Sequence, residues 1–206
     1  MRHFTTLVVL AAISAVTASC GDVARAGRAP VFLVIESLKA TAGGTTNATA
    51  TSFLQSDVQR LVSPCPVGSS CATVFGDTGV ATFHLSPKDI GALAVPTTPS
   101  SNNQVTLTRY HVTYRRADGR NTPGADVPYG FDGAATATVP ASGTASIGFE
   151  LVRTIAKTEA PLAQLALNFT IITTIADVTF YGQDLVGNEI QATGSIQVDF
   201  GNFADR

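Results

Sequence analysis

Three cysteines and three histidines are the side chains in this 206-residue chain best suited to covalent or metal chemistry. Cys65 and Cys71 lie six residues apart in a segment rich in Pro, Gly and Ser. In an exported protein such a pair predicts a disulfide, which would add about 2 kcal/mol of stability because the closed loop is small. A metal site would need two more soft ligands, and His84 and His111 do not stand at ligand spacing. The sequence therefore predicts a Cys65–Cys71 disulfide, no metal and no other cofactor.

Motifs of known catalytic sites do not occur in the sequence: there is no Gly-x-Ser-x-Gly, His-Glu-x-x-His, phosphate-binding loop or carboxylate pair. His111 falls on the strand face opposite Tyr110 and Val112, which favours a solvated histidine over a general base. We therefore expect no enzymatic activity. The formal net charge is −2, which gives no basic footprint for a nucleic acid.

The segment from Tyr114 to Phe131 concentrates arginine, acidic and aromatic side chains. Arginine beside aromatic rings suits a carboxylate, a sugar or a protein partner, and long loops in compact domains often carry function. The candidate binding residues are Tyr114, Arg115, Arg116, Asp118, Arg120, Asp126, Tyr129 and Phe131. A purely structural interpretation stays open, in which the two acids pair with the three arginines while Tyr129 and Phe131 cover one end of the domain.

Residues 1–19 have the organisation of a signal peptide. Arg2 and His3 form a short basic head, and an apolar run of ten residues follows from Leu7 to Val16. That run is too short to cross a bilayer as a helix but has the length of a secretory apolar region. The chain is therefore predicted to be exported.

The small residues that end at Cys20 resemble the lipobox of bacterial lipoproteins, although Thr17 stands where that family usually has Leu. The resemblance implies that Cys20 is lipidated and becomes the first mature residue, so that lipid attaches the protein to a membrane of the cell envelope. Asp22 does not directly follow the cysteine, which favours the outer over the inner membrane within that family. An ordinary signal peptide cut near Ala18 is the alternative.

Alternation of apolar and polar residues is clearest near the C-terminus. From Ile190 to Phe200 every second residue is apolar or small, and the segment from Val178 to Tyr181 alternates in the same way. The turn-forming residues 182–188 separate the two runs. This pattern predicts a long β-hairpin with one buried face, which needs further strands to cover it.

Other segments supply those strands. We expect strands at 31–38, 57–62, 79–85 and 104–116, the last with a β-bulge near Thr108 and Arg109 because its apolar parity changes there. Residues 135–139 and 147–151 are predicted to pair as a second hairpin. Residues 40–56 are predicted to be loop, and short helices are expected at 87–93 and at 158–166, the latter capped by Thr158.

Together these elements predict an all-β chain: an antiparallel two-sheet sandwich of immunoglobulin-like type, with about eight strands and one or two short helical turns. Asp184-x-x-Gly187-Asn188 resembles the turn before the last strand of bacterial immunoglobulin-like modules, and the whole chain resembles small uncharacterised bacterial lipoproteins. We expect residues 20–30 to be a tether and 31–206 to be one domain.

The expected function is non-catalytic binding or scaffolding in the cell envelope, with an envelope protein or a glycan as the partner, between which the sequence does not decide. A small-ligand or glycan-binding lipoprotein that uses the 114–131 loop is the alternative. A shallow groove floored by aromatic rings beside that loop would favour a glycan, whereas a bare strand edge would favour a protein partner.

Overall fold

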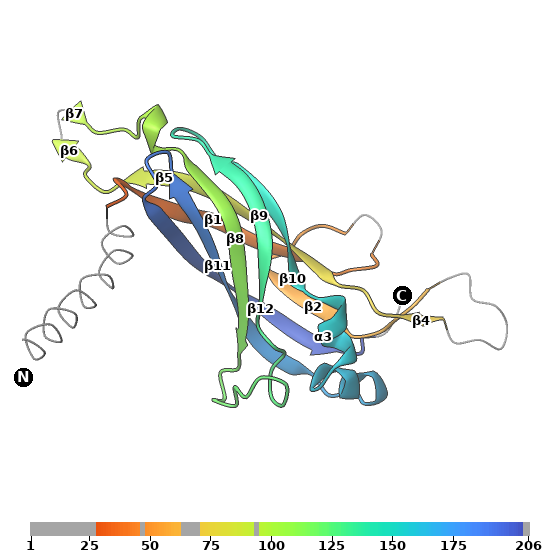
Figure 1. Ribbon diagram of the computed structural model, residues 1–206. Helices are drawn as coiled ribbons and strands as arrows, with labels where there is room; N and C mark the ends of the chain where they lie inside the picture. Colours follow the sequence, from red (N-terminus) through yellow and green to blue (C-terminus); the bar gives the residue numbers. More distant parts are fainter. Residues whose placement is uncertain (1–27, 46–47, 63–70, 93–94, 204–206) are drawn as a thin grey trace, which may run out of the picture.

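Two main β-sheets form the molecule in the computed structural model, which describes residues 28–45, 48–62, 71–92 and 95–203 (Figure 1). One sheet has three strands in the order β1-β5-β10, and the other has five in the order β2-β12-β11-β8-β9. All neighbours are antiparallel except β2 and β12, which run parallel. The strands are β1 (Val31–Thr41), β2 (Phe53–Asp57), β5 (Asp77–Pro87), β8 (Val105–Arg115), β9 (Phe131–Val139), β10 (Ala145–Val152), β11 (Ile172–Asp184) and β12 (Glu189–Gly201). The all-β prediction is confirmed.

The core lies between the two sheets, where the apolar residues of each alternating strand point inward. Phe83 of the smaller sheet meets Phe180 of the larger one edge to face, with ring centroids 4.9 Å apart. Phe149 lies 5.2 Å from Phe180 and 5.3 Å from Tyr110. These aromatic contacts join the two layers across the core and add to the stabilisation from burial.

The C-terminal hairpin is formed by β11 and β12, as the sequence predicts, and pairs over its whole length from Gln183 with Glu189 to Ile172 with Phe200. Ile190, Ile196, Val198 and Phe200 are buried on one face. The predicted bulge in β8 is also present, since its register against β9 shifts between Leu107 and Arg109.

The predicted second hairpin is wrong. Its two segments are β9 and β10, which follow one another across a short turn but belong to different sheets, because β9 pairs with β8 and β10 pairs with β5. The two strands therefore lie on opposite sides of the core and are not neighbours in one sheet. Each still has a buried apolar face, which includes Ala135 on β9 and Phe149 on β10. Alternation reveals which face is buried but not which strand lies alongside.

The two predicted helices are also misplaced. In the predicted helix at 87–93 the described residues, 87–92, are not helical, since β5 runs to Pro87 and the two-residue strand β6 follows. Near 158–166 the structure has α3 (Thr154–Thr158) and the 3-10 turn η3 (Leu162–Leu167), so Thr158 ends a helix instead of capping one. The remaining 3-10 turn among the described residues is η2 (Ser101–Asn103).

The predicted loop and the strand count need correction too. The 40–56 segment contains the start of β2, which adds to the edge of the larger sheet beside β12. The predicted strand at 57–62 is reduced to two residues. Four short strands lie outside the two main sheets, so the expected count of about eight is too low: β3 (Arg60–Leu61), β4 (Ala72–Thr73), β6 (Gly91–Ala92) and β7 (Val95–Pro96).

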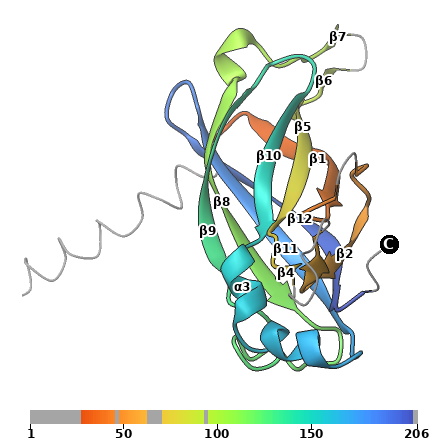
Figure 2. The same ribbon diagram turned by 90° about the vertical axis from the view of Figure 1, so that its right-hand side faces the viewer.

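The elongated molecule has two ends, which the strand pairings define. At the proximal end β1 begins, β5 ends, and the 185–188 turn joins β11 to β12. At the distal end lie the 116–130 loop, α3 and η3 (Figure 1, Figure 2). Long strands of this kind, about 3.3 Å per residue, separate the two ends by roughly 40 Å.

Candidate functional site

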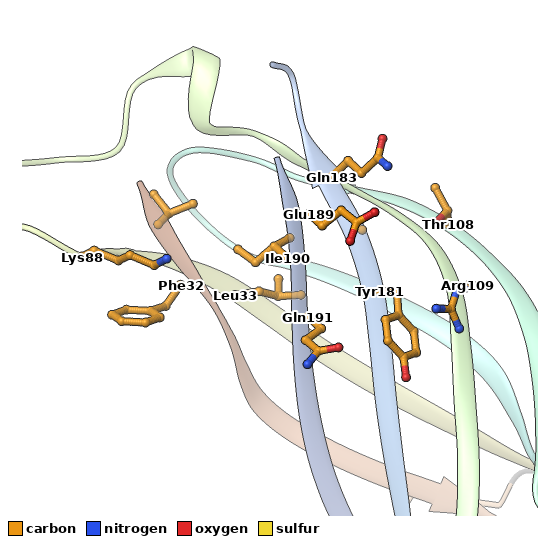
Figure 3. Close-up of a pocket in the computed structure, with 12 residues that line it drawn as sticks. Phe32, Leu33, Lys88, Thr108, Arg109, Tyr181, Gln183, Glu189, Ile190 and Gln191 are labelled. Carbon is orange, nitrogen blue, oxygen red and sulfur yellow. The ribbon is translucent and has the colours of Figure 1, made fainter. Parts of the chain in front are cut away.

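A groove crosses the proximal half of the molecule, where the start of β1 lies beside β12 (Figure 3). It encloses about 370 Å³ and extends from Phe32 and Lys88 on one side, across β12, to Tyr181 and Arg109 on the other. A second hollow continues it along residues 34–38 of β1 and 192–195 of β12. The two hollows share Phe32 and Leu33, so they form one seam between β1 and β12, which we refer to as the β1–β12 groove.

The groove lies between β1 and β12, which belong to different sheets and each pair with other strands. β1 is the edge of the three-stranded sheet and pairs with β5. β12 pairs with β11 along its length but with β2 only from Gln197 onward. Within the described parts of the chain, no strand pairs with residues 189–196 on the side of β12 that faces β1. Two bare strand edges therefore face each other.

Hydrogen-bond alternation identifies which backbone groups are bare. The N–H of Asp184 donates to the carbonyl of Asn188, and bonded pairs recur at every second residue of an antiparallel ladder. Even-numbered residues of β12 therefore bond to β11. The N–H and C=O groups of Gln191, Thr193 and Ser195 point toward the groove.

The same argument applies to β1. The N–H of Lys88 donates to the carbonyl of Pro30 at 2.9 Å, which places the even-numbered residues at the start of β1 against β5. Val31 and Leu33 then direct their backbone groups toward β12. The groove thus carries donors and acceptors on both walls.

Side chains in the groove combine stacked cations with amides. The guanidinium of Arg109 lies 3.6 Å from the ring centroid of Tyr181, and the ammonium of Lys88 lies 5.3 Å from that of Phe32. Gln183, Glu189 and Gln191 add exposed polar groups. Farther along, the groove becomes narrow, because a β-carbon on Gly194 would lie 3.1 Å from Cδ1 of Ile35.

The arginines and acids of the 114–131 loop are largely paired with each other. Asp118 Oδ2 lies 2.7 Å from Nη2 of Arg116 and 2.8 Å from Nη2 of Arg120. Hydrogen bonds from Arg120 and then Arg116 hold the pKa of the Asp118 carboxyl well below its usual range. Arg115 instead pairs with Asp177 on β11 at 2.6 Å, and the Asp126 carboxylate accepts the N–H of Thr122.

The aromatic residues of this loop pack against the domain. Tyr114 is buried and its hydroxyl donates to the carbonyl of Leu151. Phe131 is buried below the guanidinium of Arg153, which lies 4.6 Å from its ring centroid. Tyr129 is half exposed. These contacts agree with the structural interpretation of the loop, and a binding role for it stays a prediction.

His84 and His111 lie apart on the outer faces of the two sheets. His84 Nδ1 is 3.0 Å from Oε1 of Glu36, and His111 Nδ1 is 3.1 Å from Oδ1 of Asp132. Within the described residues no group of three or more His, Cys, Asp or Glu could hold a metal ion.

Of the two cysteines in the predicted disulfide, Cys71 is among the described residues. Cys71 stands at the neck of a small hairpin, where its carbonyl accepts the N–H of Val62 at 3.1 Å. Cys65 and the predicted lipidation site Cys20 lie outside the described residues, so both predictions remain predictions.

A buried ion pair at the distal end was not anticipated from the sequence. Lys157 Nζ lies 2.8 Å from Oδ2 of Asp77, and each side chain is only 1% exposed. Asp77 also accepts the hydroxyl of Ser56 and the N–H of Gly43, while Lys157 donates to the carbonyl of Asp57. Burial lowers the Lys157 pKa and Asp77 opposes that shift. No sequence motif marks the two residues, which the fold brings together from 80 positions apart.

No protein-family model matches the chain, and no curated protein matches it either. No helix in the described ranges is both long and apolar enough to cross a membrane.

Proposed function

We propose that this protein is a lipid-anchored, extracytoplasmic β-sandwich protein with a non-catalytic binding role in the cell envelope, and that the β1–β12 groove receives an extended segment of a protein partner. The observation that carries the proposal is the pair of bare strand edges. Unpaired backbone donors and acceptors in a row are complementary to another extended backbone, which adds as a further strand. The pockets beside Tyr181 and Phe32 would select its side chains.

An immunoglobulin-like origin of the domain is part of the proposal. Three features support it: the grouping of strands into sheets of three and five, the crossing between sheets at the β9–β10 turn, and the parallel pairing of β2 with the last strand. The Asp184-x-x-Gly187-Asn188 turn before β12 is a fourth. Export would also permit the Cys65–Cys71 disulfide to form.

A small ligand or glycan is the second candidate. The stacking of Arg109 on Tyr181, with amides of Gln183 and Gln191 nearby, provides a ring face and hydrogen-bonding groups of the kind that sugars use. Arg109 also has a carboxylate partner, Asp132, at 3.5 Å, as the guanidinium groups of the 114–131 loop do. What favours the groove over that loop is therefore the ring face of Tyr181 with the amides beside it.

Peptide display against the purified mature protein, in parallel with a glycan array, tests the proposal. We expect selected peptides to bind in extended form in the wide part of the groove and to slow hydrogen exchange at the amide of Gln191. Binding only to glycans would favour the second candidate. Peptides that protect amides elsewhere would disprove the groove as the site.

Two substitutions of Gln191 separate the contribution of its backbone N–H from that of its side chain. Gln191→Pro removes the outward N–H without touching the ladder to β11, and should weaken peptide binding about tenfold, since a hydrogen bond is lost and the ring obstructs the edge. Gln191→Ala removes the same side chain but keeps the N–H, and should change affinity less than about threefold. Equal losses would mean that the side chain, and not the edge, makes the contact.

A further inference from the structure

The proximal end carries exposed apolar side chains on its tips. Val186 is 74% exposed and Leu185 is 60% exposed in the turn between β11 and β12, and Ile90 is 74% exposed in the segment after β5. Phe32, at the start of β1, is 55% exposed. Exposed apolar side chains also occur at the distal end, at Leu167 and Phe169, and such residues are common on protein surfaces. The position of the chain's N-terminal segment therefore decides which end could meet a membrane.

The 185–188 turn is held rigidly by its own side chains. Oδ1 of Asp184 accepts the N–H groups of Val186 and Asn188 at 3.0 and 2.8 Å, and Oδ2 accepts Nδ2 of Asn188 at 2.8 Å. The N–H of Gly187 donates to the carbonyl of Asp184, and its φ of +83° suits glycine. Most backbone donors of this tip are thus satisfied without water, which a segment entering a water-poor layer requires.

The chain's N-terminal segment limits where the membrane can be. The described structure starts at Arg28, immediately before β1 at the proximal end. Only eight residue steps separate Arg28 from Cys20, so a lipid on Cys20 would keep Arg28 within about 28 Å of the bilayer. This step rests on the proposed lipid anchor, and it makes the proximal end the part of the domain closest to the membrane.

Charge at this end is balanced. Arg28 and Lys88 are matched by Asp89 and Glu189 among the exposed charged residues around the tips. Attraction to anionic lipids would therefore be weak, and any contact with a bilayer would come from the apolar side chains.

We propose that Leu185 and Val186 dip into the bilayer surface next to the lipid anchor and fix the orientation of the domain on the membrane. A single acyl anchor point leaves a domain free to tumble, and a second, shallow apolar contact removes that freedom. The β1–β12 groove then opens sideways just above the headgroups, and the distal end faces away from the membrane.

Tryptophan substitution tests this contact directly, because the chain contains no Trp. Val186→Trp would place the sole tryptophan on the tip. Phe169→Trp, at a distal side chain that is 95% exposed, is the matched control. The two lipidated proteins are reconstituted in phosphatidylcholine vesicles with and without lipids brominated near the headgroup.

We expect Val186→Trp to emit at shorter wavelength on vesicles and to be quenched by the bromolipid at least about twofold more than Phe169→Trp. Replacing phosphatidylcholine by anionic phosphatidylglycerol should not increase the quenching. Equal quenching of both variants, stronger quenching of Phe169→Trp, or no quenching of Val186→Trp would overturn the inference.

The proposed lipid anchor and the proposed membrane contact of Val186 can be tested separately. Mass spectrometry of the purified protein reports whether Cys20 carries lipid. For protein without it, coupling Cys20 to a phospholipid with a maleimide headgroup supplies the same tether. Quenching of Val186→Trp in that preparation would support the membrane contact even though the natural anchor is disproved, and its absence would overturn the contact.

Discussion

Lys157 and Asp77 form a buried ion pair at the distal end. Each is 1% exposed, and the pair links α3 to the start of β5, while Ser56 of β2 bonds the same carboxylate. Removing one partner leaves the other charge buried without a counter-ion. We expect Lys157→Met to lower the free energy of unfolding by about 3–5 kcal/mol, measured by urea denaturation at pH 7.

Two further variants make that result interpretable. Arg120→Met breaks an ion pair at a side chain that is 63% exposed, and should leave the urea midpoint nearly unchanged, because solvent screens exposed ion pairs. Adding Asp77→Asn to Lys157→Met removes the stranded charge and should restore part of the loss. A double variant less stable than Lys157→Met alone would show that Asp77 acts through its hydrogen bonds and not through its charge.

Tyr114 should control stability at alkaline pH. Burial, and next the nearby Asp77 carboxylate, raise the pKa of its hydroxyl far above the ordinary value of 10.0. The unfolded chain would therefore lose this proton near pH 10 while the folded chain keeps it. Because the folded state then binds more protons, the free energy of unfolding should fall above pH 10 by about 1.4 kcal/mol per pH unit.

The Tyr114→Phe variant lacks the titrating hydroxyl, so comparing it with the unchanged protein shows how much of the pH dependence of stability comes from Tyr114. The variant should be about 1–2 kcal/mol less stable at pH 7, because the carbonyl of Leu151 loses its donor. Between pH 10 and 11.5 its stability should fall less steeply than that of the unchanged protein. Parallel curves for the two proteins, from urea melts at several pH values, would contradict a raised pKa.

At the scale of elements, the C-terminal hairpin gives the sharpest test of the core. Ile196 is buried on β12 opposite Ala176, whereas Gln197 is exposed beside Asp199. Ile196→Asp places an unpaired carboxylate in the core and should reduce stability by several kcal/mol. Gln197→Asp adds the same charge one residue away and should cost less than about 1 kcal/mol. Thermal melts of both variants that showed similar losses would disprove the assigned faces.

The same hairpin shows what sequence patterns can and cannot predict. Strict alternation from Ile190 to Phe200 predicted the buried face of β12, because side chains alternate with a period of two. It could not predict the partners of β9 and β10, since both have a buried face and a short turn can either pair two strands or carry the chain to the opposite sheet. The helix at 158–166 was misplaced because capping signals are weak beside tertiary packing.

The candidate site was harder still to predict. The composition of the 114–131 loop predicted a binding site there, yet the acidic and basic side chains of this loop pair within the molecule. The β1–β12 groove has no composition signal, because it lies between two strand edges that none of the described strands joins. Such a feature depends on sheet order, which alternation alone does not determine.

The small β3–β4 hairpin carries the disulfide prediction. Its neck brings Val62 and Cys71 within hydrogen-bonding distance, so the two ends of the loop that contains Cys65 are already held close. Non-reducing peptide mapping should recover Cys65 and Cys71 joined, and reduction should lower stability by about 2 kcal/mol without unfolding the domain. Free thiols at both positions in protein from the envelope would contradict the prediction.

At the scale of the whole molecule, the position of the groove and that of the N-terminus are coupled. The groove occupies the proximal half, near the start of β1, so if Cys20 carries the proposed lipid, a partner segment that adds to β12 would approach close to the membrane. A partner anchored in the same membrane satisfies this geometry better than one in free solution, because a shared surface raises the effective concentration of both.

The anchor itself is tested at Cys20. We expect the N-terminal peptide of the mature protein to begin with a cysteine that carries diacylglyceryl or a third acyl chain, as mass spectrometry would show, and Cys20→Ala to release the protein from membranes. A bilayer buries acyl chains at about 0.8 kcal/mol per methylene group, which no exposed side chain on the proximal tips can replace. Val186→Ser should therefore leave the protein on the membrane while Cys20→Ala does not. If Cys20→Ala stayed fully bound and Val186→Ser came off, the apolar tip and not the lipid would be the principal anchor.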